Sequence, residues 1–335
     1  MKPHAPFVTW LLCLANLGAL PLAAQDQATT LLAQARAADA VVVARVTAAS
    51  DPSPEWHRLE FVTTQVLKGN SPGEFAVLEP AGACCGRSLF ALQIGDERLL
   101  FLRRRGPSWH PCGGARGVVP AAPEVVAHVT ALLAAPNDSA LAHLLADNVG
   151  HQEARIADDA AHALAVLPQI ALGSADREHV TAVLVDSMQR GTTRTAALAE
   201  VVVRTADASS MDRLLPAYLD TRHTDQARLL RTALARGNAD LVAQRLPQFV
   251  GNDLRALRAA ELLVELPAEP ARAAIEGVLA RTTHPRVALC VAEGMLAAGA
   301  RIESLQGRFP PAVLEIARTR AEGPRRFRAI EPSRR

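Results

Sequence analysis

The stretch Arg255-Ala256-Leu257-Arg258-Ala259-Ala260-Glu261-Leu262-Leu263 is one copy of a helical pattern that recurs through the C-terminal half of the chain. Three further copies align with it and begin at Arg194, Asp225 and Arg286, so the starts are 31, 30 and 31 residues apart. A single helix pair cannot bury its own apolar face, and a constant period of this length therefore indicates stacked helix pairs. We expect an all-α solenoid.

Second helices between the copies complete each unit. Helical periodicity extends over residues 210–219, 239–249 and 269–281, and upstream over 123–135, 138–146 and 153–167. Alanines at the inner positions allow neighbouring helices to approach closely. Residues 136–317 resemble short HEAT-like helical repeats, and an irregular helical bundle is the alternative to a solenoid.

The N-terminal part of the chain has a different periodicity. A helix is expected over residues 29–40 and is followed by β-branched or alternating stretches typical of strands. Five strands are predicted, at 40–46, 59–67, 74–79, 97–102 and 116–119, with loops at 51–57 and 107–111. Five short strands with a flanking helix favour a small all-β, OB-like barrel over a doubly wound sheet.

The order of several short motifs in this part resembles the bacterial netrin-like domain. The motifs are Ala38-Asp39-Ala40-Val41-Val42-Val43-Ala44-Arg45-Val46, then Phe61 with Val66-Leu67-Lys68-Gly69, Cys85-Gly86, Ile94-Gly95-Asp96-Glu97-Arg98-Leu99-Leu100-Phe101-Leu102, and Cys112. That domain is similar to the inhibitory domain of tissue inhibitors of metalloproteinases, which is an OB-fold barrel. The animal inhibitors chelate the protease zinc through an N-terminal Cys. This chain has no Cys between the expected mature end at Gln25 and Cys84, so that mode of inhibition is not expected.

The first residues have the features of an export signal. Lys2 precedes an apolar run from Phe7 to Leu22, and the small residues Ala23 and Ala24 precede polar Gln25. This order is typical of a secretory signal peptide, and the run is short for a membrane-spanning helix, which needs about 20 apolar residues. We expect cleavage near Ala24 and a periplasmic or secreted protein without membrane insertion, an uncleaved anchor being the alternative.

Four cysteines remain after removal of the signal, which contains Cys13. Export permits disulfides, and Cys112 is expected to pair with Cys84 or Cys85, since all three lie in the same predicted domain. The resemblance favours Cys85, which stands beside Gly86. A zinc site of Cys84, Cys85, His110 and Cys112 is the alternative, although adjacent cysteines are poor spacing for structural zinc. Cys290 lies in a helical pattern and is expected to be a small core residue.

Charge and motif content restrict the function. The 335 residues carry 36 Lys+Arg against 34 Asp+Glu, and the net charge of +2 gives no broad field for nucleic acid. No Gly-rich phosphate loop, Gly-x-Ser-x-Gly elbow or His-Glu-x-x-His helix occurs, and Gly113–Gly117 is expected to be a turn. The pairs Glu124/His128 and Asp158/His162 fit solvated helix faces or a capped core His, and the acids at 153–159 fit a charged first turn. No catalytic residue, cofactor or metal is predicted.

The sequence therefore divides into four predicted parts: a signal peptide (1–24), a netrin-like OB-fold domain with flanking helices (25–135), a HEAT-like domain (136–317) and an Arg-rich flexible tail (318–335). Solenoids offer extended surfaces to proteins, so the hypothesis favoured is an exported, non-enzymatic protein-interaction protein with an unidentified extracytoplasmic partner. The alternative is an extracytoplasmic enzyme or protease inhibitor whose site forms between barrel and solenoid.

Overall fold

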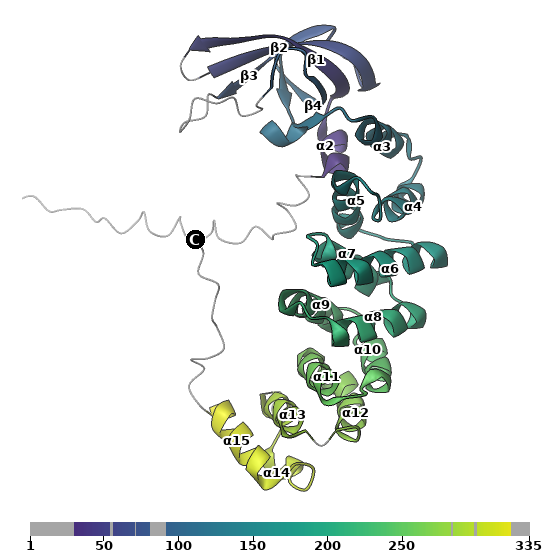
Figure 1. The fold of residues 1–335 in the computed structure, drawn as a ribbon, viewed down its shortest axis with the longest axis vertical. Coiled ribbons are helices and arrows are strands. Elements are labelled where there is room, and N and C mark those ends of the chain that lie inside the picture. The colour runs from purple at the N-terminus through teal and green to yellow at the C-terminus, as the bar shows by residue number, and fades with distance from the viewer. Residues whose placement is uncertain are drawn as a thin grey trace, which may run out of the picture. The chain divides into compact units, whose positions relative to one another are not determined.

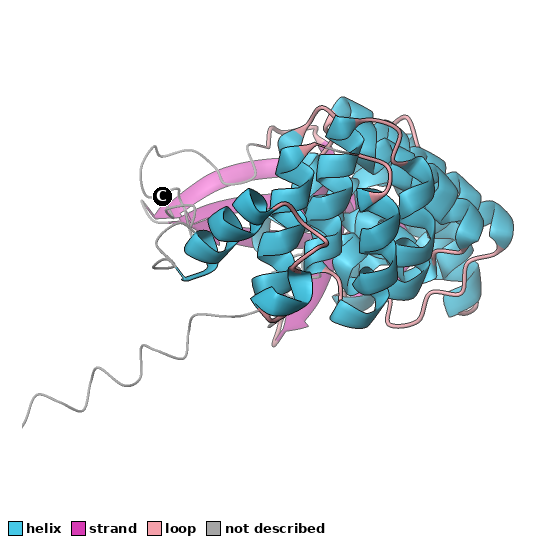
Figure 2. Cartoon of the chain, turned by 90° about the horizontal axis from the view of Figure 1, so that it is seen from below, coloured by secondary structure: helices cyan, strands magenta, loops and turns pink. Residues whose placement is uncertain are grey.

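The computed structural model describes residues 30–53, 56–70, 72–80, 92–282, 284–297 and 300–322. The chain divides into two compact units, Met1–Gln169 and Ile170–Arg335. All named strands belong to the first unit, whose described residues also form the helices α2 (Leu31–Ala37), α3 (Pro123–Ala134), α4 (Asp138–Asn148) and α5 (Ala154–Val166). Figure 2 shows the strands in magenta and the helices in cyan. The division falls later than residue 135 because α3 and α5 both pack against α2. The expected signal peptide, 1–24, lies outside the described residues.

The first unit is built on one antiparallel sheet of six strands in the order β3-β2-β1-β4-β5, with β6 also paired to β4 (Figure 1). The strands are β1 (Ala40–Ser53), β2 (Trp56–Lys68), β3 (Glu74–Pro80), β4 (Glu97–Arg105), β5 (Ser108–Pro111) and β6 (Val118–Pro120). Four register shifts along the β1–β2 pair are irregularities of the kind that bend a sheet. The edge strands β3 and β5 come close to each other, but within the described residues no ladder joins them, so the sheet is open.

Two of the expected loops are wrong. Asp51 and Trp56 lie in β1 and β2, which are longer than predicted, and residues 108–111 form β5 instead of a loop. Residues 108–111 form a strand because Gly106, with a positive φ of 60°, allows a tight turn between β4 and β5. The segment Gly113–Gly117, where a turn was predicted, contains a short 3-10 helix, η1 (Gly114–Gly117).

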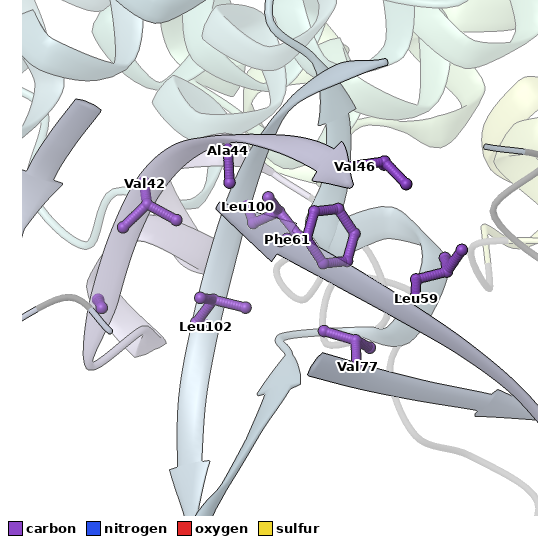
Figure 3. Packing of buried hydrophobic residues seen from close by; sticks show 9 residues of the cluster. Val42, Ala44, Val46, Leu59, Phe61, Val77, Leu100 and Leu102 are labelled. Carbon is purple, nitrogen blue, oxygen red and sulfur yellow. The ribbon is translucent and has the colours of Figure 1, made fainter. Parts of the chain in front are cut away.

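The core of the sheet follows the alternation of its strands. Figure 3 shows buried side chains from four strands gathered together, and these are Val42, Ala44 and Val46 of β1, Leu59 and Phe61 of β2, Val77 of β3, and Leu100 and Leu102 of β4. Four residues that point to the other face are also buried, namely Val41 and Val43 of β1 and Leu99 and Phe101 of β4. Both faces of these strands are therefore covered, which explains their continuous apolar runs.

The C-terminus of α2 is held by two cations. Lys68 Nζ donates to the carbonyl oxygens of Ala35 (2.8 Å), Arg36 (3.3 Å) and Ala38 (2.7 Å), while Arg103 donates through Nε and Nη2 to the Ala37 oxygen (3.3 and 3.0 Å). The last carbonyls of a helix lack intrahelical partners and carry partial negative charge. Lys68 therefore joins the end of β2 to the end of α2.

The second unit contains helices in two rows. The even row is α6 (Ser174–Arg190), α8 (Ala208–Asp220), α10 (Ala239–Arg245) and α12 (Ala268–Leu279). The odd row is α7 (Thr195–Thr205), α9 (Thr224–Arg236), α11 (Asp253–Glu265) and α13 (Pro285–Ala297), followed by α15 (Pro311–Glu322). Each helix packs against the next member of its own row, as Figure 1 shows for α7, α9, α11 and α13. Short segments η2 (Leu246–Phe249) and α14 (Ile302–Leu305) complete this unit.

Ion pairs between successive helix pairs repeat with the period of the sequence. Arg177 contacts Asp207 (3.2 Å), Arg213 contacts Glu178 (2.7 Å), Arg231 contacts Glu261 (3.0 Å) and Arg245 contacts Asp212 (3.3 Å). The partners are 30 to 35 residues apart in sequence, or one repeat. Exposed pairs stabilise little individually, but each of these pairs joins one helix to the next member of the same row.

The helical unit continues beyond its expected end. The flexible tail was expected from residue 318, yet α15 runs to Glu322, with Arg318 bound to Glu315 (2.7 Å) and Arg320 bound to Glu293 of α13 (2.9 Å). Buried Val313, Leu314 and Ala317 hold α15 in place. The rest of the tail, residues 323–335, lies outside the described residues.

Candidate functional site

The β4–β5 hairpin brings several chemically active side chains to one face of the sheet. Arg103 lies opposite His110 and Arg105 lies opposite Ser108 in the ladder. Successive side chains on a strand point to opposite faces, so Arg103, Arg105 and His110 share one face. Cys112 is two residues beyond His110 and its backbone N–H donates to the Phe101 oxygen (2.7 Å), which continues the same register.

These side chains line a pocket of about 180 Å³, which we call the β5 pocket. Its lining comes from α2, β4 and β5 and comprises Ala33, Gln34, Ala37, Arg103, Arg105, His110, Pro111, Cys112 and Gly113. Arg103 is fixed by its two hydrogen bonds to the Ala37 carbonyl. The described residues that line the pocket provide two guanidinium groups, an imidazole and a thiol, and none of them carries a carboxylate.

The electrostatic environment of Cys112 reflects this charge. Burial is the largest effect and raises the pKa of the Cys112 thiol, which nearby Asp39 also raises. Arg103, Lys68 and Arg105 act in the opposite direction and lower this pKa. The desolvation cost of a thiolate exceeds the attraction of the three cations, so a reduced Cys112 is held in the neutral form.

Of the residues predicted for a disulfide or a zinc site, the structure brings together His110 and Cys112. Cys84 and Cys85 lie outside the described residues, so the disulfide and its zinc alternative stay predictions. Arg103 and Arg105 were not predicted as site residues. The sequence does contain a pattern that indicates them, because residues two apart on a strand share one face, as in Arg103-x-Arg105 and His110-x-Cys112.

A buried polar cluster anchors the start of α2. An Asp159 carboxylate oxygen of α5 accepts the backbone N–H of Leu31, and the other oxygen lies 3.4 Å from Nε2 of His128 on α3. Both side chains are only 2% exposed. Of the two expectations for His128, the core histidine is the one that the structure shows. The charged first turn expected for Asp159 is wrong, because Asp159 is buried in the middle of α5. Asp159 satisfies one of the N–H groups at the N-terminus of α2 that have no intrahelical acceptor, so this buried cluster is structural.

The second unit presents a different feature, an apolar exposed face. Among the described residues of this unit, the large apolar side chains that are exposed all lie on the odd row: Leu229 on α9, Leu254 and Val264 on α11, and Ile316 on α15. Leu254 is 61% exposed. The described residues of the even row contribute none to this set. We call these four side chains the odd-row face.

An apolar pocket of about 260 Å³ adjoins this face between α11, α12 and α13. Val264 belongs to both features. The other lining residues are Leu263, Leu266, Ala271, Arg272, Ile275, Val291, Gly294, Met295 and Ala300, of which Arg272 is the charged one. Gly294 brings α13 close to α11, because a Cβ at this position would lie 2.3 Å from the Val264 side chain.

Cys290 lies on α13 and is half-buried, in partial agreement with the expected core position. Burial, the largest effect, raises the pKa of its thiol to about 11, and Glu261 and Glu293 raise it further while Arg231 lowers it. Such a thiol is almost entirely protonated at neutral pH and is a weak nucleophile.

Comparisons with protein-family models, with curated proteins and with solved structures found no match to this chain. The netrin-like and HEAT-like resemblances therefore stay hypotheses. Within the part of the chain that the structure describes, no helix has both the length and the apolar character needed to cross a membrane.

Proposed function

We propose that this protein is an exported, non-enzymatic interaction protein whose helical unit, a HEAT-like solenoid, binds a protein partner through the odd-row face. The observation that carries the proposal is the segregation of exposed apolar side chains. Leu229, Leu254, Val264 and Ile316 all lie on the odd row. Exposed apolar side chains gathered on one surface are typical of interaction sites, whereas scattered ones need no explanation.

The helix packing supports this role. Successive odd-row helices contact each other, so the exposed apolar side chains of α9, α11 and α15 are spread over several helix pairs, and repeat proteins bind partners through surfaces of that extent. The apolar pocket beside Val264 offers a place for one apolar side chain of the partner. In this proposal the sheet unit is an OB-like domain, and it is exported with the helical unit after cleavage near Ala24.

A matched pair of variants tests the face. Leu229→Glu with Leu254→Glu adds two negative charges to the odd row. Gln244→Glu with Gln248→Glu adds the same charge to exposed positions of α10 and η2. The mature protein, with a photo-cross-linker at residue 228 or 257, is incubated with the extracytoplasmic fraction of its source.

We expect a discrete cross-linked protein that is lost with the Leu variant and retained with the Gln variant. Equal cross-linking by both variants would contradict the odd-row face as the binding surface. Intact-mass analysis of the exported protein should give a chain starting close to Gln25, and a cytoplasmic protein that retains Met1 would contradict export.

A further inference from the structure

We propose that the β5 pocket is a binding site for a small dianionic oxyanion, with a phosphate group as the ligand class that its charge and size fit. This site belongs to the sheet unit and does not depend on the function proposed for the odd-row face. Three features of the pocket support this proposal: its positively charged side chains have few protein partners, these side chains have fixed positions on the hairpin, and the volume of the pocket suits a phosphate group.

The first feature is the positive charge of the side chains that line the pocket. Among the described residues, the side chains of Arg105 and His110 have no hydrogen-bond or ion-pair partner, although both residues line the pocket. Arg103 donates through Nε and Nη2 to the Ala37 carbonyl, and its Nη1 has no partner within the part of the chain that the structure describes. The nearby acid, Asp39, is already engaged, since its Oδ2 accepts the backbone N–H of Arg104 (2.8 Å). The two guanidinium groups match the charge of a phosphate dianion.

The second feature is the placement of these side chains on two paired strands. Arg103 and Arg105 alternate on one strand, and His110 faces Arg103 from the next strand. Guanidinium groups present several N–H donors in a plane and bind phosphate oxygens in pairs. Side chains on strands are positioned more rigidly than side chains on loops. The Ala37 carbonyl at the end of α2 fixes Arg103, so at least one donor is in place before the anion arrives.

The charged groups near Cys112 are mostly positive. Arg103 and Arg105 line the pocket together with Cys112, Lys68 also acts on its sulfur, and Asp39 is the acid that does so among the described residues. A cysteine sulfur in a disulfide carries no charge, so the oxidised Cys112 expected in the exported protein does not oppose an anion in the pocket.

The third feature is the volume of the pocket. A volume of about 180 Å³ compares with roughly 30 Å³ for one water molecule in the liquid. The pocket therefore accommodates the five heavy atoms of a phosphate and a few atoms attached to it. A volume of this size suits one phosphate group, so the proposed ligand is a phosphate ion or the phosphate group of a small molecule.

Isothermal titration calorimetry of the mature protein at low ionic strength tests the proposal. Inorganic phosphate is the first ligand, glycerol phosphate distinguishes a phosphate ester from the free ion, and acetate represents a single negative charge. We expect saturable binding of at least one phosphate ligand, with acetate at least about tenfold weaker, because one charge-assisted hydrogen bond contributes about 1.5–3 kcal/mol. Absence of phosphate binding, or equal binding of acetate, would overturn the proposal.

Matched variants locate the site. Arg105→Gln should weaken phosphate binding about tenfold, by the same hydrogen-bond estimate. Arg104→Gln is the control, since it removes the same charge from the opposite face of β4, where Nε of Arg104 donates to the Gly106 oxygen (3.2 Å). His110→Gln gives a second variant within the pocket. An equal loss of phosphate affinity in the Arg104 and Arg105 variants would mean that phosphate binding depends only on the net charge of the protein, and it would refute the pocket as the binding site.

Discussion

Tyr218 of α8 and Arg258 of α11 are joined by two reciprocal hydrogen bonds. The Tyr218 hydroxyl donates to the backbone oxygen of Arg258 (3.1 Å), and Nη1 of Arg258 donates to the backbone oxygen of Tyr218 (3.0 Å). Tyr218 lies in the last turn of α8, where carbonyls lack intrahelical partners. Arg258 supplies that partner and so joins the even row to the odd row.

Removal of the Tyr218 hydroxyl should lower the stability of the helical unit modestly. We expect Tyr218→Phe to reduce the free energy of unfolding by about 0.5–1.5 kcal/mol, the net contribution of one hydrogen bond. Tyr218→Ala should cost about 3–5 kcal/mol, because the buried ring leaves a cavity. Urea denaturation followed by circular dichroism measures both values, and equal costs for the two variants would contradict the assigned roles of ring and hydroxyl.

Burial raises the pKa of Tyr218 far above its ordinary value near 10. Since Tyr218 is the one tyrosine of the chain, absorbance at 295 nm reports its ionisation without interference from another phenol. The folded protein should show no tyrosinate at pH 10–11, whereas the urea-unfolded chain should titrate near pH 10. The folded pKa exceeds the unfolded value, so this contribution to stability is complete below pH 10 and is lost as the pH rises further.

Lys68 and Gly69 fix the end of α2 against the sheet. Lys68→Met keeps the aliphatic stem but removes the donor to three carbonyls, and we expect a loss of about 1.5–3 kcal/mol, the range for hydrogen bonds to a charged group. Gly69 has φ of +73°, and a Cβ there would lie 2.0 Å from the Asp39 oxygen. Gly69→Ala should therefore also destabilise the sheet unit.

Arg58→Gln is the control for these two variants, since Arg58 is an exposed residue of the same strand that contacts Glu60 (3.0 Å). Thermal unfolding should show lower transition temperatures for Lys68→Met and Gly69→Ala and an almost unchanged one for Arg58→Gln. A shift of equal size in all three would mean that any change on β2 acts in the same way, against a specific role for the end of α2.

The repeats and the β4–β5 hairpin show why sequence analysis succeeded in one unit more than in the other. Helix positions in the second unit follow from a pattern repeated four times, and the structure places α7, α9, α11 and α13 over the four copies. The hairpin rests on one turn at Gly106, and its second strand has only four residues, Ser108–Pro111. Such a short strand forms because β4 is already in place to pair with it, which no local pattern reveals.

The buried pair of His128 and Asp159 illustrates a second limit. The two residues are 31 positions apart and lie on different helices, whereas the sequence offered Glu124 as the neighbour of His128 one helical turn away. Local spacing predicts contacts within a helix. It does not predict which polar residue of one helix meets another in the core.

Cys290 should react slowly with alkylating reagents. With a pKa of about 11, its thiolate fraction at pH 8 is on the order of a hundredfold below that of an unperturbed cysteine. Mass spectrometry of the peptide that contains Cys290 should show slow iodoacetamide modification at pH 8, accelerating as the pH rises. Its raised pKa also predicts that the protein loses stability as the pH rises from 9 toward 11.

Glu261→Gln removes a charge that raises the pKa of Cys290 and should accelerate the reaction. Glu265→Gln is the control, because Glu265 also pairs with Arg231 (2.7 Å) but is not among the groups that shift the pKa of Cys290. Equal rates for the two variants would show that access to the sulfur, and not ionisation, limits the reaction.

Truncation after Arg281 tests whether the second unit behaves as a repeat array. The deletion removes α13 and α15, which pack in sequence on α11. If each helix pair depends mainly on its neighbours, the remaining helices should stay folded with a moderately lower transition temperature. Circular dichroism gives the helix content of the remainder. Cooperative loss of all helices in this unit would instead indicate a globular bundle.

The last prediction concerns Cys112. We expect it to be oxidised to Cys85 or Cys84 in the exported protein. Side chains of adjacent residues in extended backbone point in different directions, so only one of these two cysteines can aim at Cys112. Thiol counting on the denatured mature protein should find two free thiols among its four cysteines. Cys112→Ser should lower the free energy of unfolding by about 2–4 kcal/mol, because the reduced chain regains unfolded-state entropy. Cys290→Ser is the control and should reduce the thiol count by one without opening the disulfide. Four free thiols, with zinc released on denaturation, would replace the disulfide by the metal site of Cys84, Cys85, His110 and Cys112.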